Sequence, residues 1–172
     1  MQIRDCLPDD IAAVRTIYSH HVTHGLGTFE TETPTLAEMQ SRHAQITRAG
    51  FPYLVGTEEG RIVGYAYANQ FRPRASYRHT VEDSIYVAPD ATGRGYGRTL
   101  LAALIERCAG LGLRQMIAVI GDSSNLGSIA VHRACGFVET GLLKGVGRKF
   151  DRWVDVVLMQ RCLGPGDSSP PE

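Results

Sequence analysis

The sequence has no excess of charge of either sign. Its 172 residues include 18 Lys and Arg against 18 Asp and Glu, so the formal net charge is zero. A neutral chain offers no general electrostatic attraction to nucleic acid or to an anionic membrane, and we expect neither as a partner. The chain also lacks any apolar run close to the ~20 residues that a membrane-spanning helix needs. Since the segment from Met1 to Arg4 is typical of a strand rather than of a signal peptide, we expect a cytoplasmic protein.

Cysteine is scarce, and its spacing gives no pairing motif. The four Cys residues lie far apart and none forms a Cys-x-x-Cys pair, which is typical of free thiols in a reducing compartment. His20 and His24 have the spacing of one helical turn, but no Glu completes a His-Glu-x-x-His motif around them. We therefore expect a solvated helix end there and no metal site.

Length and composition predict one domain. A chain of this size can bury about two thirds of its unfolded surface without disulfides or metals. The segment after residue 162 is rich in Gly, Pro and Ser, a composition typical of disorder. We expect a single domain over residues 1–162 and a flexible C-terminal tail over residues 163–172.

Apolar periodicity predicts an α/β fold with helices and strands in mixed order. Strands are expected over residues 3–6, 52–57, 61–69, 81–87, 115–121, 139–146 and 153–160, which together form a mixed sheet. One helix has an apolar face from Ile11 to Tyr18, a second follows a Thr35 cap, a third starts just after Gly95, and a fourth ends at Gly136.

A glycine-rich loop between strand 81–87 and the third helix is the most informative segment. Pro89 ends the strand, and Gly93, Gly95 and Gly97 follow before an apolar helical repeat begins at Leu100. The first N–H groups of a helix have no partner within the helix, and the helix dipole is positive at that end. We therefore expect the main chain of this loop to bind a phosphate or pyrophosphate.

Three kinds of phosphate-binding loop compete for this segment. A mononucleotide P-loop is excluded, because Thr92 stands in the place of its first glycine and Arg98 in that of its lysine. A dinucleotide fingerprint requires Gly-x-Gly-x-x-Gly, whereas the spacing here is Gly-x-Gly-x-Gly, although Asp122 could supply its acidic residue. The third candidate is a loop that binds coenzyme A, and a family resemblance favours it.

The region from Val81 to Phe137 resembles the GNAT superfamily of acyl-CoA-dependent N-acetyltransferases. The shared order is strand, Arg-Gly-Tyr-Gly loop, helix, strand, asparagine, helix and a Gly-Phe pair. The segments most similar to the phosphinothricin and methionine sulfone acetyltransferase branch are Thr80–Val87, Asn125–Ile129 with His132, and Phe150–Asp155. The resemblance extends from Ile3 to Arg161 and implies a mixed, mostly antiparallel twisted sheet of about seven strands flanked by about four helices.

The resemblance implies acetyl-CoA as co-substrate. Thr92 departs from the superfamily, which usually has Gln or Arg there, but backbone amides make most pyrophosphate contacts in such loops. A backbone N–H near Tyr86 or Val87 is expected to bind the thioester carbonyl where the strand leaves its neighbour. Asn125 either caps the fourth helix or bonds to the pantetheine, and both roles could coexist. The expected acetyl-CoA-binding residues are Ile85, Tyr86, Val87, Thr92, Gly93, Arg94, Gly95, Tyr96, Gly97, Arg98, Asn125 and Ser128.

Two residues are candidates for proton transfer. The resemblance implies that Glu82 accepts the ammonium proton of the acceptor; its alternative is an ion pair with Arg78 or Arg74. Because side chains alternate along a strand, we expect only one of Glu82 and Asp83 to face the site. His132 stands where many superfamily members have a tyrosine that protonates the leaving thiolate, so it is a second catalytic candidate. It could instead bond to the sulfur or be a buried core residue, so the general acid stays open.

The acceptor pocket is expected to be lined by arginines and aromatic rings. Guanidinium groups suit a carboxylate, phosphinate or sulfone oxygen, although an arginine-rich loop could also be a solvated connection. The candidates are Phe29, Arg72, Arg74, Tyr77, Arg78 and Lys149, the last of them reaching across the subunit interface of a homodimer like those of related enzymes.

The function implied is direct transfer of acetyl from acetyl-CoA to the α-amino group of a small amino-acid analogue in a ternary complex. Phosphinothricin, methionine sulfone and methionine sulfoximine are the leading acceptors. Acetylation of a protein N-terminus or lysine, and a non-catalytic acyl-CoA-binding sensor, are the alternatives.

Overall fold

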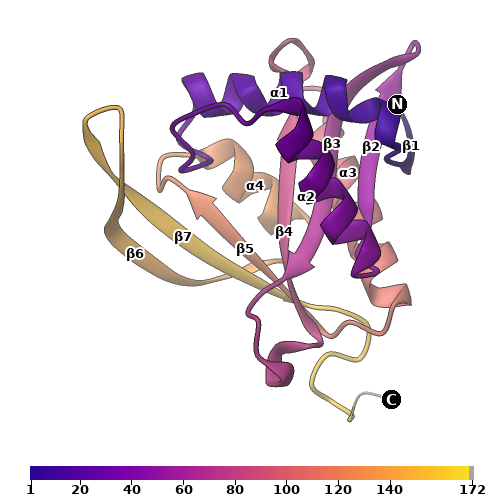
Figure 1. The fold of residues 1–172 in the computed structure, drawn as a ribbon. Helices are drawn as coiled ribbons and strands as arrows, with labels where there is room; N and C mark the ends of the chain where they lie inside the picture. The colour runs from indigo at the N-terminus through magenta and orange to yellow at the C-terminus, as the bar shows by residue number, and fades with distance from the viewer. Residues whose placement is uncertain (171–172) are drawn as a thin grey trace.

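The computed structural model describes residues 1–170, in which seven strands form one sheet of order β1-β2-β3-β4-β5-β7-β6 (Figure 1). The strands are β1 Gln2–Asp5, β2 Tyr53–Glu58, β3 Arg61–Gln70, β4 Thr80–Val87, β5 Gln115–Gly121, β6 Val138–Lys149 and β7 Arg152–Cys162. The α-helices are α1 Ile11–His24, α2 Leu36–Arg48, α3 Tyr96–Gly110 and α4 Leu126–Ala134. The predicted mixed α/β fold is confirmed.

Strands β4 and β5 form the parallel pair of an otherwise antiparallel sheet. Their pairing covers only Thr80–Glu82 against Gln115–Ile117, while β4 stays paired to β3 as far as Val87. Beyond Glu82 the two strands diverge, as the ribbon in Figure 1 shows. The predicted parting of β4 from its neighbour is confirmed, and it leaves main-chain groups unpaired on both sides of a slot.

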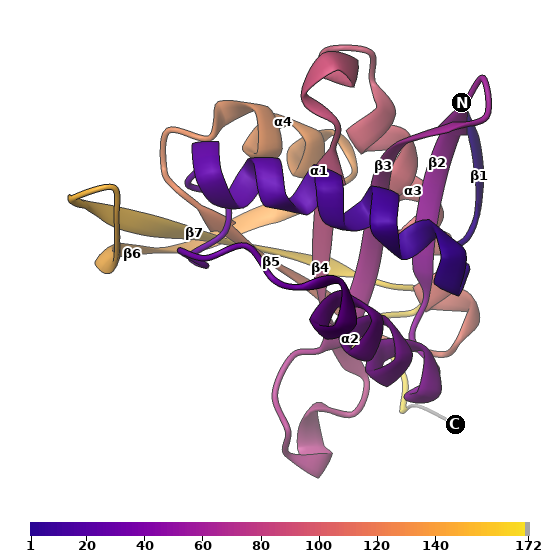
Figure 2. The same ribbon diagram turned by 45° about the horizontal axis from the view of Figure 1, so that its top comes forward.

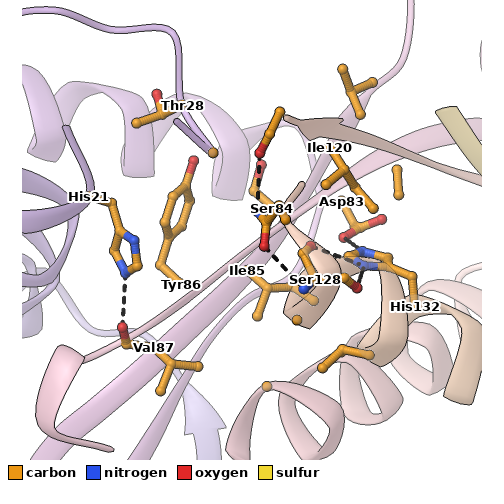
Figure 3. Close-up of a pocket in the computed structure, with 18 of the residues that line it drawn as sticks. His21, Thr28, Asp83, Ser84, Ile85, Tyr86, Val87, Ile120, Ser128 and His132 are labelled. Carbon is orange, nitrogen blue, oxygen red and sulfur yellow. Dashed lines mark hydrogen bonds and ion pairs between the residues drawn. The ribbon is translucent and has the colours of Figure 1, made fainter. Parts of the chain in front are cut away.

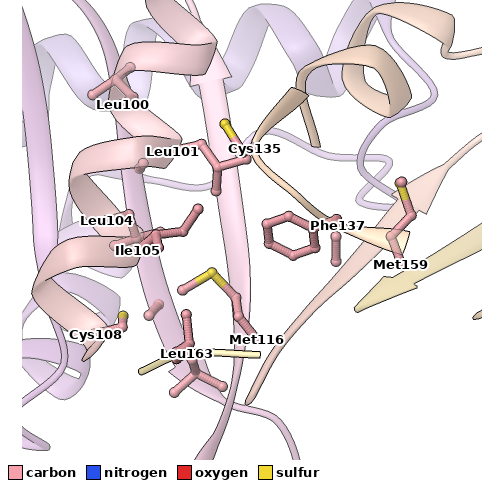
Figure 4. Packing of buried hydrophobic residues seen from close by; sticks show 14 of the residues in the cluster. Leu100, Leu101, Leu104, Ile105, Cys108, Met116, Cys135, Phe137, Met159 and Leu163 are labelled. Atoms are coloured by element: carbon pink, nitrogen blue, oxygen red, sulfur yellow. The ribbon is translucent and has the colours of Figure 1, made fainter. Parts of the chain in front are cut away.

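The helices cover both faces of the sheet. Helices α1 and α2 lie on one face, and α3 and α4 lie on the other (Figure 2). The α3 side packs Leu100, Leu104 and Phe137 into the core with at most 2% of each residue exposed (Figure 4). Burial of such side chains contributes roughly 1.5–3 kcal/mol each, so this layer holds α3 rigidly behind the slot.

Local signals set the helix starts as predicted. Thr35 caps α2 by accepting from the Glu38 N–H at 3.2 Å, and the Glu38 carboxylate accepts from the Thr35 N–H at 2.6 Å. Gly95 is the N-cap of α3 with φ of 80°, a conformation that glycine adopts without strain. Within residues 1–170, none of the helices is long and apolar enough to cross a bilayer.

The last two strands are longer than predicted. Both continue to a tight turn at Phe150 and Asp151, whose φ values are 48° and 58°. A register shift between Leu143 and Gly147 lets β6 pass its glycines without ending, which the alternation of apolar residues does not reveal. The result is a β6–β7 hairpin that extends beyond the body of the sheet (Figure 1).

The segment after β7 folds back on the sheet. Leu163, inside the predicted flexible tail, is 1% exposed and belongs to the core. The Arg114 guanidinium donates to the carbonyls of Gly166 at 3.3 Å and Pro170 at 3.0 Å. The last residues of the predicted tail, 171 and 172, lie outside the described residues.

Candidate active site

A cavity of about 730 Å³ occupies the slot between the diverging strands (Figure 3). Its walls are the outer halves of β4 and β5, the glycine loop before α3, the first turns of α4, and the loop at Gly27–Phe29. The predicted site residues that line it are Phe29, Glu82, Ile85, Tyr86, Val87, Thr92, Gly93, Gly95, Tyr96, Gly97, Arg98, Asn125, Ser128 and His132. The structure therefore brings the phosphate loop and both proton-transfer candidates to one cavity.

The N-terminus of α3 faces this cavity without a side-chain cap. The first intrahelical bond joins the Thr99 N–H to the Gly95 carbonyl at 3.1 Å, so the N–H groups of residues 96–98 have no partner within the helix. A phosphate placed there meets several donors and the positive end of the helix dipole.

The Arg94 side chain forms an ion pair instead of lining the cavity. Its guanidinium lies 3.1 Å from the Glu58 carboxylate in the turn after β2, and the residue is not among those lining the cavity. The Tyr96 hydroxyl bonds to the same Glu58. Arg94 is thus the one predicted cofactor residue that does not line the cavity.

His21, which the sequence analysis did not select, fixes the end of β4. Its Nε2 lies 2.9 Å from the Val87 carbonyl oxygen, and because that oxygen accepts, Nε2 bears the proton. Burial lowers the pKa of His21 against the effect of this bond, so the ring is neutral and donates. The sequence gives no signal for this contact beyond the position of His21 on α1, between His20 and His24.

Asn125 uses both ends of its amide within the protein. Its Oδ1 accepts from the Ser128 N–H at 3.2 Å, which confirms the predicted helix cap. Its Nδ2 donates to the Gly121 carbonyl at 3.1 Å and so ties the end of β5 to α4. A bond from Asn125 to the pantetheine stays a prediction.

Glu82 projects into the cavity as a half-buried carboxylate. It forms no ion pair within residues 1–170, so the alternative of an ion pair with Arg74 or Arg78 is wrong. Burial raises the pKa of Glu82, the neighbouring Asp83 carboxylate raises it further, and Arg72 opposes the increase. A carboxylate of raised pKa without a fixed partner is suited to accept a proton.

Asp83 also lines the cavity, so the expectation that only one of the two acids reaches it is wrong. The two side chains leave opposite faces of β4, but the slot opens between the strands and exposes both faces. Asp83 Oδ2 lies 3.0 Å from His132 Nε2, and His132 Nδ1 lies 2.7 Å from the Ser128 carbonyl oxygen. His132 is therefore a paired histidine rather than an isolated one in an apolar core.

The predicted arginine cluster lies outside the lining of the cavity. Arg72, Arg74, Tyr77 and Arg78 belong to the β3–β4 connection, at the end of β4 opposite the glycine loop. The Arg72 guanidinium stacks 5.1 Å from the centre of the Phe71 ring. No guanidinium of the cluster pairs with a carboxylate in the described part of the chain.

Lys149 is 3% exposed and serves the site indirectly. Its Nζ donates to the Thr28 carbonyl at 2.8 Å, which joins the β6–β7 hairpin to the loop that forms one cavity wall. Burial lowers the pKa of Lys149, and Glu30 opposes this. Lys149 is not among the cavity-lining residues, and no sequence signal indicated its contact with Thr28, which is 121 residues away.

Comparison with known proteins identifies the family. Residues 15–137 match the model of the Acetyltransferase (GNAT) family. The chain belongs to the GNAT family.

Its relatives in that family include proteins named as N-acetyltransferases. It is 53% identical over 170 residues to a phosphinothricin N-acetyltransferase of Alcaligenes faecalis, covering 99% of this chain and 86% of that one. It is 41% identical over 98% of each chain to an L-methionine sulfoximine/L-methionine sulfone acetyltransferase of Pseudomonas aeruginosa. A solved phosphinothricin acetyltransferase from Sinorhizobium meliloti in complex with acetyl-CoA superposes with a TM-score of 0.97 and 46% identity, covering 99% of this chain and 92% of that one.

Within residues 1–170, no group of three His, Cys, Asp or Glu side chains is close enough to hold an ion. GNAT enzymes use acetyl-CoA as acetyl donor, and the uncapped α3 N-terminus, the glycines before it and the open edge of β4 fit that ligand.

Substitution of Gly95 with Ala tests the phosphate cradle. A Cβ at this position meets nothing within 4 Å, but the φ of 80° strains any other residue by ~1–2 kcal/mol. We expect relief of that strain to move the loop and to weaken acetyl-CoA binding about five- to thirtyfold, measured by calorimetry. Gly112→Ala is the matched control, because Gly112 has φ of 75°, equally open surroundings and a place at the far end of α3. Equal acetyl-CoA affinity in the two variants would contradict the assignment.

Proposed function

We propose that this protein transfers acetyl directly from acetyl-CoA to the α-amino group of a small amino-acid analogue in a ternary complex. Phosphinothricin, methionine sulfone and methionine sulfoximine are the leading acceptors, in line with the names of its relatives. The observation that carries the proposal is a carboxylate without an ion-pair partner in the described part of the chain, Glu82, in the same slot as an uncapped helix N-terminus. A screen of free amines with acetyl-CoA tests it directly. Release of the CoA thiol is the quantity measured.

Acetyl-CoA binding follows from the two walls of the slot. The pyrophosphate binds at residues 96–98 of α3, and the pantetheine extends along the edge of β4 that β5 leaves unpaired. A main-chain N–H near Tyr86 or Val87 then polarises the thioester carbonyl. His21 holds the last carbonyl of β4 and keeps this edge in place.

Glu82 is the proposed general base. An ammonium group cannot attack a thioester, so one proton has to leave the nitrogen before the C–N bond forms. Glu82 accepts that proton, directly or through water. Its raised pKa lies closer to that of the ammonium group than an ordinary carboxyl pKa does. His132 is the proposed source of the proton that the departing CoA thiolate requires.

The acceptor approaches from the end of β4 that bears the arginine cluster. Arg72 is near enough to Glu82 to oppose the rise in its pKa. Guanidinium groups in this connection bind the acceptor's carboxylate, while Phe29 closes the opposite wall.

The exposed β6–β7 hairpin is the proposed interface of a homodimer. Trp153 is 70% exposed, Val146 55% and Phe150 54%, and Leu142 and Leu143 are also exposed on the same hairpin. An apolar surface of this kind on one arm is typical of a protein–protein contact. The proposed enzyme is thus a cytoplasmic homodimer of single-domain chains that needs neither nucleic acid nor a membrane.

Replacement of Glu82 by Gln keeps the side chain's shape and removes the base. We expect kcat to fall ~10²–10⁴-fold with acetyl-CoA affinity retained. The loss shrinks at high pH, where more of the amine is already neutral. In the wild type, the acid limb of kcat/KM lies above the ordinary Glu value of about 4.3, because the pKa of Glu82 is raised. Glu106→Gln, an exposed position on α3, is the control, and near-normal kcat in Glu82→Gln between pH 6 and about 9 removes Glu82 from the mechanism.

Single Ala substitutions at Arg72, Arg74 and Arg78 test the acceptor site. At the arginine that contacts the carboxylate, we expect acceptor binding to weaken by about 1.5–3 kcal/mol with acetyl-CoA binding unchanged. Steady-state KM for both substrates distinguishes the two effects. Arg48→Ala, on the exposed face of α2, gives the baseline. If all three variants keep the wild-type acceptor KM, the cluster is a solvated connection.

Trp153→Asp tests the proposed dimer. A charge in the centre of an apolar contact is costly to desolvate, so we expect the variant to sediment as a monomer at concentrations where the wild type is a dimer. Leu111→Asp, at a 56% exposed position after α3, serves as control. A wild type that sediments as a monomer would refute the interface.

A further inference from the structure

The Asp83–His132 pair is a buried ionisable unit that Glu82 chemistry does not use. The two side chains are 2% and 4% exposed, and their contact joins β4 to α4 across 3.0 Å (Figure 3). Both residues line the cavity beside Ser128. The Phe137 ring packs against the imidazole in a T-shaped arrangement, with a centroid distance of 5.0 Å and an interplanar angle of 87°.

The hydrogen-bond partners of His132 determine how many protons the pair holds. Nδ1 faces the Ser128 carbonyl oxygen at 2.7 Å, and Nε2 faces the Asp83 carboxylate. Both partners are acceptors, whereas a neutral imidazole has a single N–H. Both contacts are satisfied when a second proton lies between His132 and Asp83, which makes the pair an imidazolium with a carboxylate.

The surroundings favour the doubly protonated state of His132, called the loaded state below. Burial lowers the pKa of His132, but the Asp83 hydrogen bond and charge and the Ser128 carbonyl outweigh it, so the pKa is raised. Asp83 Oδ1 is buried with no hydrogen-bond partner in the described chain, and a carboxylate short of donors attracts the His132 proton more strongly.

Other charges near the pair are few. On β4, the neighbouring Glu82 carboxyl has a pKa that burial and the Asp83 charge raise. From α3, the Cys108 thiol faces Asp83 and is neutral, because burial raises its pKa to about 12. The Cys135 thiol, at the end of α4, also has a pKa raised by burial, although Arg98 and Arg161 lie close enough to lower it.

The Ser128 hydroxyl connects the pair to the cavity. Its Oγ lies 3.4 Å from His132 Nδ1, which also faces the Ser128 carbonyl oxygen at 2.7 Å. Because Nδ1 bears a hydrogen, Oγ can act only as the acceptor in this contact. The hydrogen of Oγ is then free to point into the cavity that Ser128 lines.

We propose that Asp83, His132 and Ser128 form a proton relay that delivers a proton to the CoA sulfur as it leaves. The relay rests on the proposed acetyl transfer. Asp83 is a positioning residue that keeps His132 loaded, and Ser128 is the catalytic residue that touches the sulfur.

The relay balances in protons and charge. As the C–S bond breaks, the sulfur takes the proton of Ser128 Oγ, and Oγ takes the proton of His132 Nδ1. The imidazolium becomes a neutral imidazole that keeps Nε2–H on Asp83, so one negative charge moves from the sulfur to the pair. Nδ1 then faces the Ser128 carbonyl without a proton, which favours reloading from solvent once CoA has left.

Kinetics of Asp83→Asn and Ser128→Ala test the relay. Asn keeps an oxygen for Nε2–H but removes the charge that holds the second proton. We expect both variants to lose kcat about 10–100-fold with unchanged KM for acetyl-CoA, while only Asp83→Asn moves the alkaline limb of kcat to lower pH. A merely structural role for Asp83 would leave that limb in place, and this result would overturn the relay.

A change of leaving group isolates the step. The selenium analogue of acetyl-CoA releases a far more acidic selenol, which departs as an anion without needing a proton. With this donor we expect both variants to recover most of the wild-type kcat, whereas Glu82→Gln stays impaired. Equal losses with sulfur and selenium donors would overturn the proposal.

Nitrogen NMR of the folded wild type gives a readout that does not depend on turnover. At pH 7.5 we expect both ring nitrogens of His132 to have the shifts of protonated nitrogens, and a single protonated nitrogen in Asp83→Asn. His21 is the internal reference, because it is half-buried and bonds to one acceptor, the Val87 carbonyl at 2.9 Å. A singly protonated His132 in the wild type would overturn the relay even if acetylation is confirmed. A doubly protonated His132 in a protein that acetylates no amine would instead reject the proposed function.

Discussion

The parting of β4 and β5 after three residue pairs is the constraint on which the site depends. A continuous ladder would satisfy these main-chain groups and fill the space with side chains. Because the strands diverge, both faces of β4 open to one cavity, and residues 82 and 83 contribute to it despite pointing in opposite directions. Pairing with β3 as far as Val87 keeps β4 in place although its other edge is unpaired.

The two faces of β4 also give the carboxyl groups of Glu82 and Asp83 different surroundings. Within residues 1–170, Glu82 has no ion-pair partner, whereas Asp83 is bonded to His132. Since the Asp83 charge raises the pKa of Glu82, any change in the protonation of the pair alters the basicity of its neighbour. The proposed base and the carboxylate that pairs with His132 are thus coupled through adjacent residues of one strand.

Features set by neighbours in sequence were predictable. The start of α3 at Gly95 and the cap of α2 at Thr35 follow from local backbone needs, and the glycine motif with Asn125 located the cavity's walls. The contacts that define the chemistry are not local. Asp83 and His132 are 49 residues apart, and their pairing depends on how α4 packs against a strand that has lost its neighbour. Periodicity along the chain contains no information about such a distance.

The bond between Lys149 and the Thr28 carbonyl has a further consequence. It connects an arm with an exposed apolar surface to the loop that encloses the cavity on the side of Phe29. Breaking this contact would leave the buried Lys149 ammonium without solvation. A shift of the arm is therefore expected to move the loop at Thr28 with it. In the proposed homodimer, a partner subunit on the arm therefore also positions the wall, so we expect acceptor affinity to fall on dilution.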